Sequence, residues 1–343
     1  MLKQRSHLTS VLAVAMLGIA ACGSATKAPT RTPTPTASPS ATAGTPTPTP
    51  VPTPVPLAAP IMIQVENIDA ARPQSGLSQA DVVYEYQTEG GISRFTTIFF
   101  HNPTGQVGPV RSARLATIKL LGIWGGTLLF SGASNYVSRM LDSSGYRHFN
   151  ETSAAGALYR IGSRFAPHNL YTDGGHLAAF EQRLRPLTVG YQLWPRTPIA
   201  SLPPSGFNPI GKFQVPISQS ERPIFTYDPA TQSYTRVEPQ TGQLNDANGG
   251  GPWRPTTIVV LQTKITIGPE VEYVSGTHGL DFALVYGIGD GQVFVGGQQY
   301  PVKWFQGPSG PPQLTQIGGQ PAPIGPGQVL VELVPSGQTV IPR

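Results

Sequence analysis

The chain of 343 residues contains a single cysteine, Cys22, and its N-terminal apolar run is short. That run extends from about Leu8 to Ala21, roughly 14 residues, whereas a helix that crosses a bilayer needs about 20. A transmembrane helix is therefore excluded at this point of the chain. Because the only thiol lies at the end of the run, where acylation is expected, a cysteine nucleophile elsewhere is excluded as well.

The sequence around Cys22 is typical of a bacterial lipoprotein signal. Lys3 and Arg5 precede the apolar run, and residues 19–22 (Ile-Ala-Ala-Cys) close it. A basic start, an apolar run and small residues before the cleavage site define a secretory signal. We expect residues 1–21 to be removed and Cys22 to carry acyl chains, palmitate among them, that anchor the protein to the outer face of the cytoplasmic membrane. The alternative is an ordinary signal peptide in which Cys22 occurs by chance.

Residues 22–59 have little that could form a folded core. They consist mostly of Thr, Pro, Ala and Ser, with repeated Thr-Pro units. Such a composition buries too little apolar surface to offset chain entropy, and frequent proline favours extended polyproline II geometry. We therefore expect a disordered linker that holds the folded part away from the membrane. Its Ser/Thr-Pro composition also suits O-glycosylation.

The part of the chain that is expected to fold also lacks an excess of charge of either sign. Residues 60–343 carry 19 basic and 18 acidic groups, so they provide no field that would attract nucleic acid. Residues 60–200 contain only one lysine, Lys119, among 12 basic residues. Arginine binds carboxylate and phosphate through a planar fork that lysine lacks. This bias hints at an oxyanion ligand, although a high-GC genome would favour arginine codons equally well.

The spacing of apolar residues predicts two domains of different fold class. Residues 60–200 alternate strand-like runs with helical patterns, which is typical of an α/β or α+β domain. The expected strands cover 61–65, 82–86, 95–100 and 127–130, and the expected helices begin near Ala113 and Tyr136. Residues 201–343 contain short alternating runs punctuated by proline and glycine, so we expect a β-rich domain. Its expected strands include 257–261, 281–286, 292–295 and 329–333, with hairpin turns at Asp290-Gly291 and Gly296-Gly297.

One segment of the first domain suggests an anion site. Residues 108–114 read Gly-Pro-Val-Arg-Ser-Ala-Arg. If a helix begins at Ala113, Ser112 is its N-cap, and Arg111 and Arg114 flank its first turn. Free backbone amides, the positive end of the helix dipole and two guanidinium groups would then converge, as they do around phosphate or carboxylate. In the alternative, both arginines pair with nearby acids and fix the helix to the sheet; the candidate acids are Asp81, Glu85 and Glu89.

Several segments together resemble the YerB-like family of bacterial lipoproteins. They are residues 71–77 (Ala-Arg-Pro-Gln-Ser-Gly-Leu), 80–85 (Ala-Asp-Val-Val-Tyr-Glu), 89–95 (Glu-Gly-Gly-Ile-Ser-Arg-Phe), 108–114, and 166–171 (Ala-Pro-His-Asn-Leu-Tyr). Ser93 replaces the threonine of the family pattern. The resemblance covers most of residues 60–336 and implies a cell-envelope lipoprotein with a two-part domain of unknown function. Where relatives tend to carry a histidine after the fourth strand, this chain has Phe130 to Ser134, so no role built on that histidine carries over.

His168 and Asn169 follow a proline and are expected on a loop, where functional side chains concentrate. His168 could act as a general base, as a hydrogen-bonding group for a ligand, or as a support of its loop. Ser131 is a candidate for a ligand-facing loop after a strand. The histidines show no metal-binding spacing and no serine sits in a nucleophile elbow, so we predict no metal and no cofactor. The candidate ligand-binding residues are Glu89, Arg94, Arg111, Ser112, Arg114, Ser131, His168 and Asn169.

Two classes of function fit these residues. The first is a membrane-anchored binding or scaffolding module that recognises an anionic envelope ligand, a glycan or a partner protein through arginine side chains. The second is an envelope enzyme, a transferase or hydrolase, that acts on phosphate-linked or acidic cell-wall polymers. The sequence leaves open whether the protein catalyses a reaction.

Overall fold

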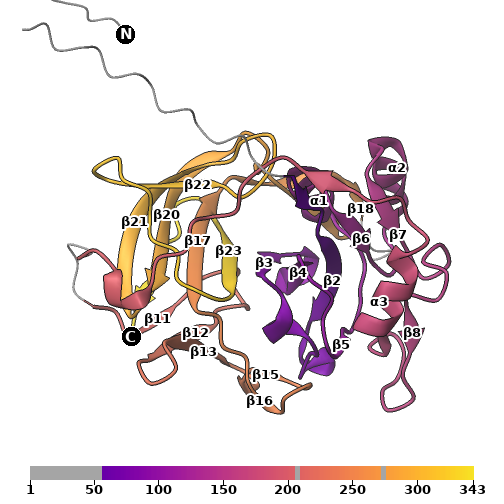
Figure 1. Ribbon diagram of the computed structural model, residues 1–343, viewed down its shortest axis with the longest axis horizontal. Helices are drawn as coiled ribbons and strands as arrows, with labels where there is room; N and C mark the ends of the chain where they lie inside the picture. Colours follow the sequence, from indigo (N-terminus) through magenta and orange to yellow (C-terminus); the bar gives the residue numbers. More distant parts are fainter. Residues whose placement is uncertain (1–55, 205–208, 272–275) are drawn as a thin grey trace, which may run out of the picture. The chain divides into compact units, whose positions relative to one another are not determined.

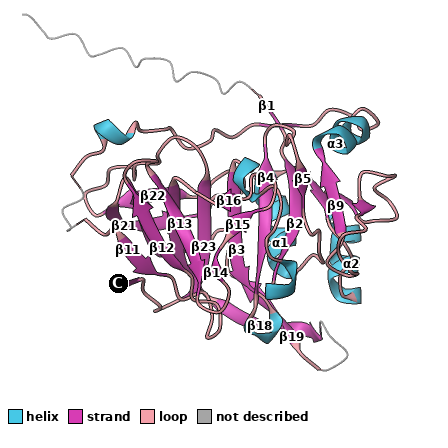
Figure 2. Cartoon of the chain, turned by 90° about the horizontal axis from the view of Figure 1, so that it is seen from below, coloured by secondary structure: helices cyan, strands magenta, loops and turns pink. Residues whose placement is uncertain are grey.

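The computed structural model describes residues 56–204, 209–271 and 276–343. The expected signal peptide, Cys22 and most of the expected linker lie outside these ranges, and the last residues of that linker form the short strand β1 (Leu57–Ala58). Strands predominate over helices in the described residues (Figure 2), which confirms the predicted mixed N-terminal part and β-rich C-terminal part. Among these residues, no helix has the length and apolar character that a bilayer span requires.

A ten-stranded mixed sheet contains strands from both halves of the sequence (Figure 1). In spatial order its strands are β22 (Gln313–Gln316), β21 (Gln298–Phe305), β20 (Ile288–Val295), β17 (Thr257–Thr263), β23 (Val329–Pro335), β3 (Val82–Gln87), β4 (Ser93–Phe99), β2 (Ile61–Asn67), β6 (Thr127–Leu129) and β7 (Arg147–Phe149). Strand β23 lies between β17 and β3 and is parallel to both. Residues near the end of the chain therefore complete a sheet that the first half begins.

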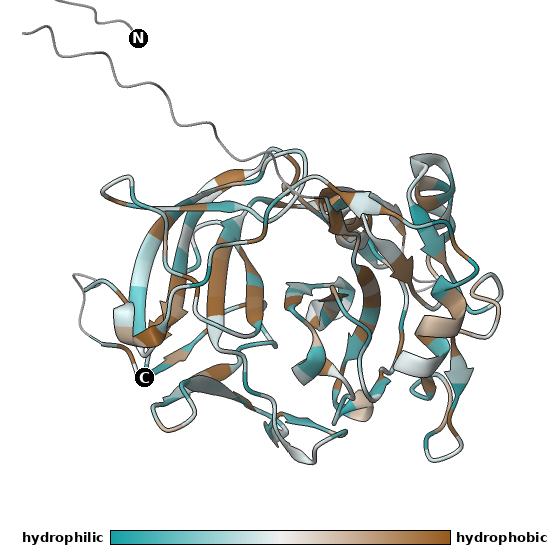
Figure 3. Cartoon of the chain, in the orientation of Figure 1, coloured by the Kyte–Doolittle hydropathy of each residue, from teal (hydrophilic) through white to brown (hydrophobic). Residues whose placement is uncertain are grey.

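Alternate residues of the central strands enter two hydrophobic cores, one on each face of the sheet. In β3, Tyr84 and Tyr86 belong to one core and Val83 to the other, as expected from the two-residue period of a strand. All seven residues of β2 are buried. Strands covered on both faces are predominantly apolar, and Figure 3 shows this hydrophobic character along β2 and β17.

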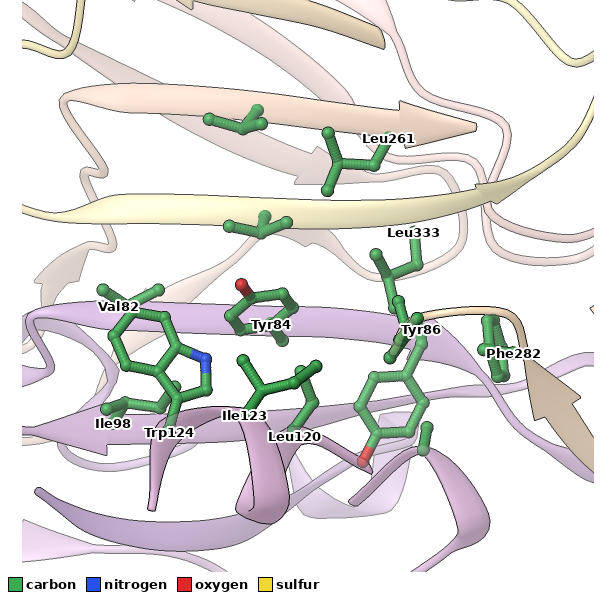
Figure 4. Close-up of a cluster of buried hydrophobic side chains, with 14 of the residues drawn as sticks. Val82, Tyr84, Tyr86, Ile98, Leu120, Ile123, Trp124, Leu261, Phe282 and Leu333 are labelled. Atoms are coloured by element: carbon green, nitrogen blue, oxygen red, sulfur yellow. The ribbon is translucent and has the colours of Figure 1, made fainter. Parts of the chain in front are cut away.

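Helix α1 (Leu115–Trp124) covers one face of the sheet, and α2 (Asn135–Ser144) packs beside it. Figure 4 shows Leu120, Ile123 and Trp124 of α1 lying against Tyr84 and Tyr86 of β3. The rings of Trp124 and Tyr84 meet edge to face, with 6.2 Å between their centroids. The apolar residues of this segment are those that the helix buries against β3, so their pattern predicts the helix correctly.

The start of α1 differs from the prediction of Ser112 as N-cap. The helix begins at Leu115 with Arg114 as N-cap, because Thr117 Oγ1 accepts a hydrogen bond from the Arg114 amide at 2.9 Å. Ser112 therefore lies in the preceding loop. Helix α2 is capped by Ser134, whose hydroxyl accepts from the Val137 amide at 3.3 Å.

A five-stranded sheet covers the other face through aromatic contacts. Its order is β14 (Gly242–Gln243), β13 (Ser233–Glu238), β12 (Ile224–Asp228), β11 (Lys212–Gln214) and β24 (Ile341–Pro342). Phe213 of β11 stacks on Phe294 of β20 at 3.9 Å, and Phe95 of β4 packs against Trp253. The remaining elements are β5 (Gln106–Val107), β9 (Leu170–Asp173) and β8 (Tyr159–Arg160) in a three-stranded sheet, the pairs β1/β10 (Thr188–Val189), β15 (Asn245–Asp246)/β16 (Gly251–Pro252) and β18 (Ile265–Val271)/β19 (His278–Phe282), and helix α3 (Gly174–Glu181).

Two sequence predictions for the second half need correction. Asp290-Gly291 is not a hairpin turn, because both residues lie inside β20 and pair with β21. Gly296-Gly297 is the turn that joins these strands, and both glycines have positive φ, 61° and 73°. The strand expected over 281–286 ends at Phe282.

Candidate functional site

Glu66, near the end of β2, is the centre of the candidate site. The Gly-Pro-Val-Arg segment runs beside β2, because the Arg111 amide donates to the Gln64 carbonyl at 2.8 Å. This pairing brings the Arg111 side chain to Glu66, where Nε donates to Oε1 at 2.8 Å. His168 reaches the same carboxylate from the loop before β9, with Nδ1 2.8 Å from Oε2. One carboxylate thus holds side chains from two separate sequence motifs.

Burial differs sharply among these three groups. The Glu66 side chain is 1% exposed, whereas those of Arg111 and His168 are 27% and 23% exposed. A carboxylate only accepts hydrogen bonds, so Nδ1 of His168 carries the proton in this contact. Within the described part of the chain, the Arg111 terminal nitrogens and His168 Nε2 form no hydrogen bond to protein. A buried acid therefore orients two half-buried side chains whose other polar atoms stay available.

Ser131 and Glu151 extend the site along the neighbouring strand ends. Ser131 follows β6 and Glu151 follows β7; β6 is parallel to β2, and β7 to β6, so their carboxyl ends meet at one edge of the sheet. Ser131 Oγ donates to Glu151, while Arg160 donates to Glu151 at 2.7 Å and to Asn169 Oδ1 at 2.6 Å. The carboxyl edge of parallel strands is the usual ligand position in open α/β sheets.

Ser112 is joined to this edge by the backbone. The Ser131 amide donates to the Arg111 carbonyl at 2.9 Å, and the Ala113 amide donates to the Gly132 carbonyl at 3.0 Å. The loop before α1 and the loop after β6 therefore run side by side. We use the name strand-end surface for the predicted residues that are brought together here, which are Arg111, Ser112, Ser131, His168 and Asn169.

The other predicted residues, Glu89, Arg94 and Arg114, lie in a buried group. Arg114 is 6% exposed and its Nε donates to both oxygens of Glu89, at 2.8 and 2.9 Å. Burial alone would raise the Glu89 pKa, but the hydrogen bonds and charge of Arg114 outweigh it and hold that pKa below its ordinary value. Arg94 is 2% exposed and donates to the Ser112 carbonyl at 3.0 Å. These contacts match the alternative in which Arg114 fixes the helix to a nearby acid.

The sequence reasoning did not name Glu66, Glu151 or Arg160 as site residues. Glu66 has a recognisable signal, because it is the one charged residue in the otherwise mostly apolar strand β2. Glu151 and Arg160 lie in turn and loop segments whose spacing carries no comparable signal. Within the residues that the structure describes, no cluster of three or more histidine, cysteine, aspartate or glutamate side chains is arranged to hold a metal ion.

A second charged group links the two halves of the chain; of its members, the sequence analysis named only Glu85, as a candidate partner of Arg111 or Arg114. Arg236 of β13 is fully buried and contacts Glu85 of β3 at 2.9 Å, Glu238 at 2.5 Å and Glu332 of β23 at 3.4 Å. Burial raises the pKa of Glu332 well above its ordinary value, and the Glu85 charge adds to this effect. Burial also acts on Glu85, but Arg236 outweighs it and lowers the Glu85 pKa. This group is internal, so we assign it a structural role.

These features define a protein of two sequence parts that share one central sheet and carry a polar surface at its strand ends. The chain belongs to the DUF3048 family of proteins of unknown function. The model of the family's N-terminal domain matches residues 47–186, and that of its C-terminal domain matches residues 213–331.

One curated relative and one solved structure are similar to this chain over most of its length. The relative is named "Putative lipoprotein YerB", from Bacillus subtilis (strain 168); it is 28% identical over 289 residues, which are 80% of this chain and 81% of the relative. The crystal structure of the YerB protein from Bacillus subtilis is similar with a TM-score of 0.67 at 24% identity, covering 82% of this chain and 93% of that one. The structural similarity supports the fold.

Proposed function

We propose that this protein is a cell-envelope lipoprotein that binds an anionic ligand at the strand-end surface. The name of the relative and the pattern at residues 19–22 support attachment through acyl chains on Cys22 to the outer face of the cytoplasmic membrane. In that location, the expected ligands are an acidic wall polymer, a charged glycan or an envelope protein that presents carboxylate or phosphate groups.

The observation that carries this proposal is the contact of both Arg111 and His168 with Glu66. Because Nε of Arg111 is held by a buried carboxylate, its terminal nitrogens are oriented before a ligand arrives, which reduces the entropy lost on binding. A guanidinium group in this position suits the geometry of carboxylate or phosphate oxygens. Since Glu66 offsets the charge of Arg111, we expect directed hydrogen bonds to dominate recognition over a long-range positive field.

Arg111→Lys tests this proposal with little risk to the fold. Lysine keeps a positive charge beside the buried Glu66 but removes the guanidinium fork. Charged hydrogen bonds contribute roughly 1.5 to 3 kcal/mol each, so we expect the affinity for an anionic ligand to fall by about tenfold or more. The measurement is retention of the full chain by cell-wall fragments and, separately, by vesicles that contain a pyrophosphate lipid.

Arg254→Lys is the matched control. Arg254 is also half-buried, with 34% of its side chain exposed, and it also pairs with an acid, Asp228, at 3.0 Å. The control should bind like the unmodified protein. Equal retention of all three proteins on both supports would remove the strand-end surface as the anion site.

The Glu66–His168 contact also favours a second candidate, an envelope hydrolase or transferase. A carboxylate that fixes Nδ1 of a histidine leaves Nε2 able to accept a proton from an attacking hydroxyl or water, as in acid–base catalysis. Turnover of a lipid-linked wall polymer by the unmodified protein, lost in His168→Gln while binding persists, would support this candidate. Binding without turnover would contradict the enzyme candidate and leave the binding module as the proposed function.

A further inference from the structure

A separate cavity of about 690 Å³ opens where the Glu89–Gly91 turn meets the loop between β11 and β12. Its lining includes Gln87, Gly90, Gly91, Ser220, Arg222 and Gln338. We call this cavity the Arg222 pocket. Its volume falls within the range of about 300 to 1,000 Å³ that is usual for small-ligand sites. None of the residues of the strand-end surface lines it, so the two sites are independent.

The glycine pair of the motif Glu-Gly-Gly-Ile-Ser-Arg-Phe forms one wall of this pocket. Gly90 and Gly91 both have left-handed φ, 75° and 79°, which side chains with a Cβ disfavour. The Gly91 carbonyl accepts hydrogen bonds from the hydroxyls of Ser218 and of Ser220, the latter at 2.7 Å. A Cβ on Gly90 would meet no atom within 4 Å. The first half of the chain is thus fixed to the second while the Gly90 backbone faces open space.

Arg222 is the only charged residue that lines the pocket. Within the described part of the chain its guanidinium group forms no ion pair or hydrogen bond. The adjacent Glu221 is buried, and its carboxylate lies 3.6 Å from Arg72 and not beside Arg222. The charge of Arg222 is therefore not neutralised by a fixed internal acid. A cavity with one such guanidinium group suits a ligand that carries a single accessible anionic group.

The other polar side chains of the lining indicate the rest of the ligand. Gln87, Gln219 and Gln338 contribute carboxamides, which each donate and accept, and the described residues provide no hydrogen-bond partner for these groups. Sugar hydroxyls have the same dual character. Pro216 and Pro335 add small apolar surfaces of the kind that the C–H face of a sugar ring can cover, and no aromatic residue lines the pocket. We propose that the Arg222 pocket binds a saccharide bearing a carboxylate, with Arg222 as the carboxylate partner.

Calorimetric titration of the full chain with tetragalacturonate tests this proposal. We expect saturable binding that is lost with the neutral methyl ester of the same oligosaccharide. Arg222→Ala should weaken binding about tenfold or more, the loss expected for a charged hydrogen bond. Since the Arg222 guanidinium group forms no hydrogen bond or ion pair in the described residues, this variant should unfold close to the temperature of the unmodified protein. Gln338→Ala should weaken binding by a smaller factor.

Arg185→Ala is the matched control, because it removes one exposed arginine that lines a different cavity; it should bind like the unmodified protein. Three results would overturn the proposal: no saturable binding, equal affinity of Arg222→Ala and unmodified protein, or equal affinity for the ester. Equal binding of an acidic peptide with the same charge would reject the saccharide as the ligand class. Arg111→Lys leaves this pocket intact, so failure here is distinct from failure at the strand-end surface.

Discussion

Among single side chains, the buried glutamates differ in what offsets the cost of burial. Glu89 is bonded to Arg114 and keeps a lowered pKa. Glu221 lies 3.6 Å from Arg72, but burial and the charges of two nearby carboxylates raise its pKa to about 7. A raised pKa means that ionisation of Glu221 disfavours the folded state.

Glu221 should therefore make the protein less stable as pH rises from about 4.5 to 7. Over that range the unfolded chain loses its Glu221 proton while the folded chain retains it, so stability falls with increasing pH. One pKa unit corresponds to about 1.4 kcal/mol, so the loss should be no more than about 3.5 kcal/mol. Glu221→Gln should flatten this part of the profile, as measured by urea denaturation at pH 4.5 and 7.5. An unchanged difference between the two pH values would contradict the assignment.

The chemistry of single residues was only partly accessible from the sequence. The motifs correctly singled out Arg111 and His168, but their common partner Glu66 lies about 45 and 100 positions away in sequence, and only the strand pairing brings the three together. Arg114 belongs to the same motif as Arg111, yet it turns inward to Glu89. Two arginines only three positions apart can thus lie in different environments, which composition and spacing do not reveal.

Among the local elements, the Glu89–Gly91 turn allows a direct comparison of two neighbouring glycines. Both have left-handed φ, so alanine at either position should cost about 1–2 kcal/mol in backbone strain. A Cβ on Gly91 would also lie 2.9 Å from Ser220 Oγ. Gly91→Ala should therefore displace this hydroxyl and cost about 1 kcal/mol more than Gly90→Ala. Thermal unfolding of the two variants, alone and with Ser220→Ala, measures the difference.

The Ser220→Ala background should remove the difference between the two glycine variants, because the displaced hydroxyl is then absent. A difference that persists there would show that the turn is constrained by something other than its contact with Ser220.

The sequence predicts strands and helices well where a long run of apolar residues is buried. It predicts them poorly where a dipeptide typical of turns lies inside a paired strand. Asp290-Gly291 has turn chemistry but lies within β20. A Cβ on Gly291 would lie 2.7 Å from the Val260 carbonyl oxygen of β17. The glycine is required there for the close approach of two strands, a use that the dipeptide alone cannot distinguish from a turn.

For the molecule as a whole, the main consequence is that neither half alone completes the ten-stranded sheet. Strand β3 has β4 on one side and β23 on the other, and β23 comes from the last residues of the chain. The sequence predicted the mixed and β-rich character of the halves because composition is local. It could not show that β23 lies between β17 and β3, because the pairing of β23 with β3 joins positions more than 200 residues apart.

Arg236→Met should destabilise the whole molecule, because Arg236 contacts carboxylates of β3, β13 and β23. Removing it leaves buried acids without their cation, which typically costs about 3–5 kcal/mol. Urea denaturation at pH 7 measures the loss. Arg254→Met, which breaks a half-exposed pair with Asp228, should cost no more than about 1 kcal/mol. Similar losses in both variants would show that the buried group is not what joins the halves.

The most direct test of the central claim is an NMR titration of the full chain with inorganic pyrophosphate, observing the side-chain nitrogens of arginine and histidine. We expect the signals of Arg111 Nε and of the His168 ring nitrogens to shift together and saturate, while the Arg254 Nε signal stays in place. Saturable binding that leaves Arg111 and His168 unshifted would contradict the assignment of the strand-end surface as the anion site.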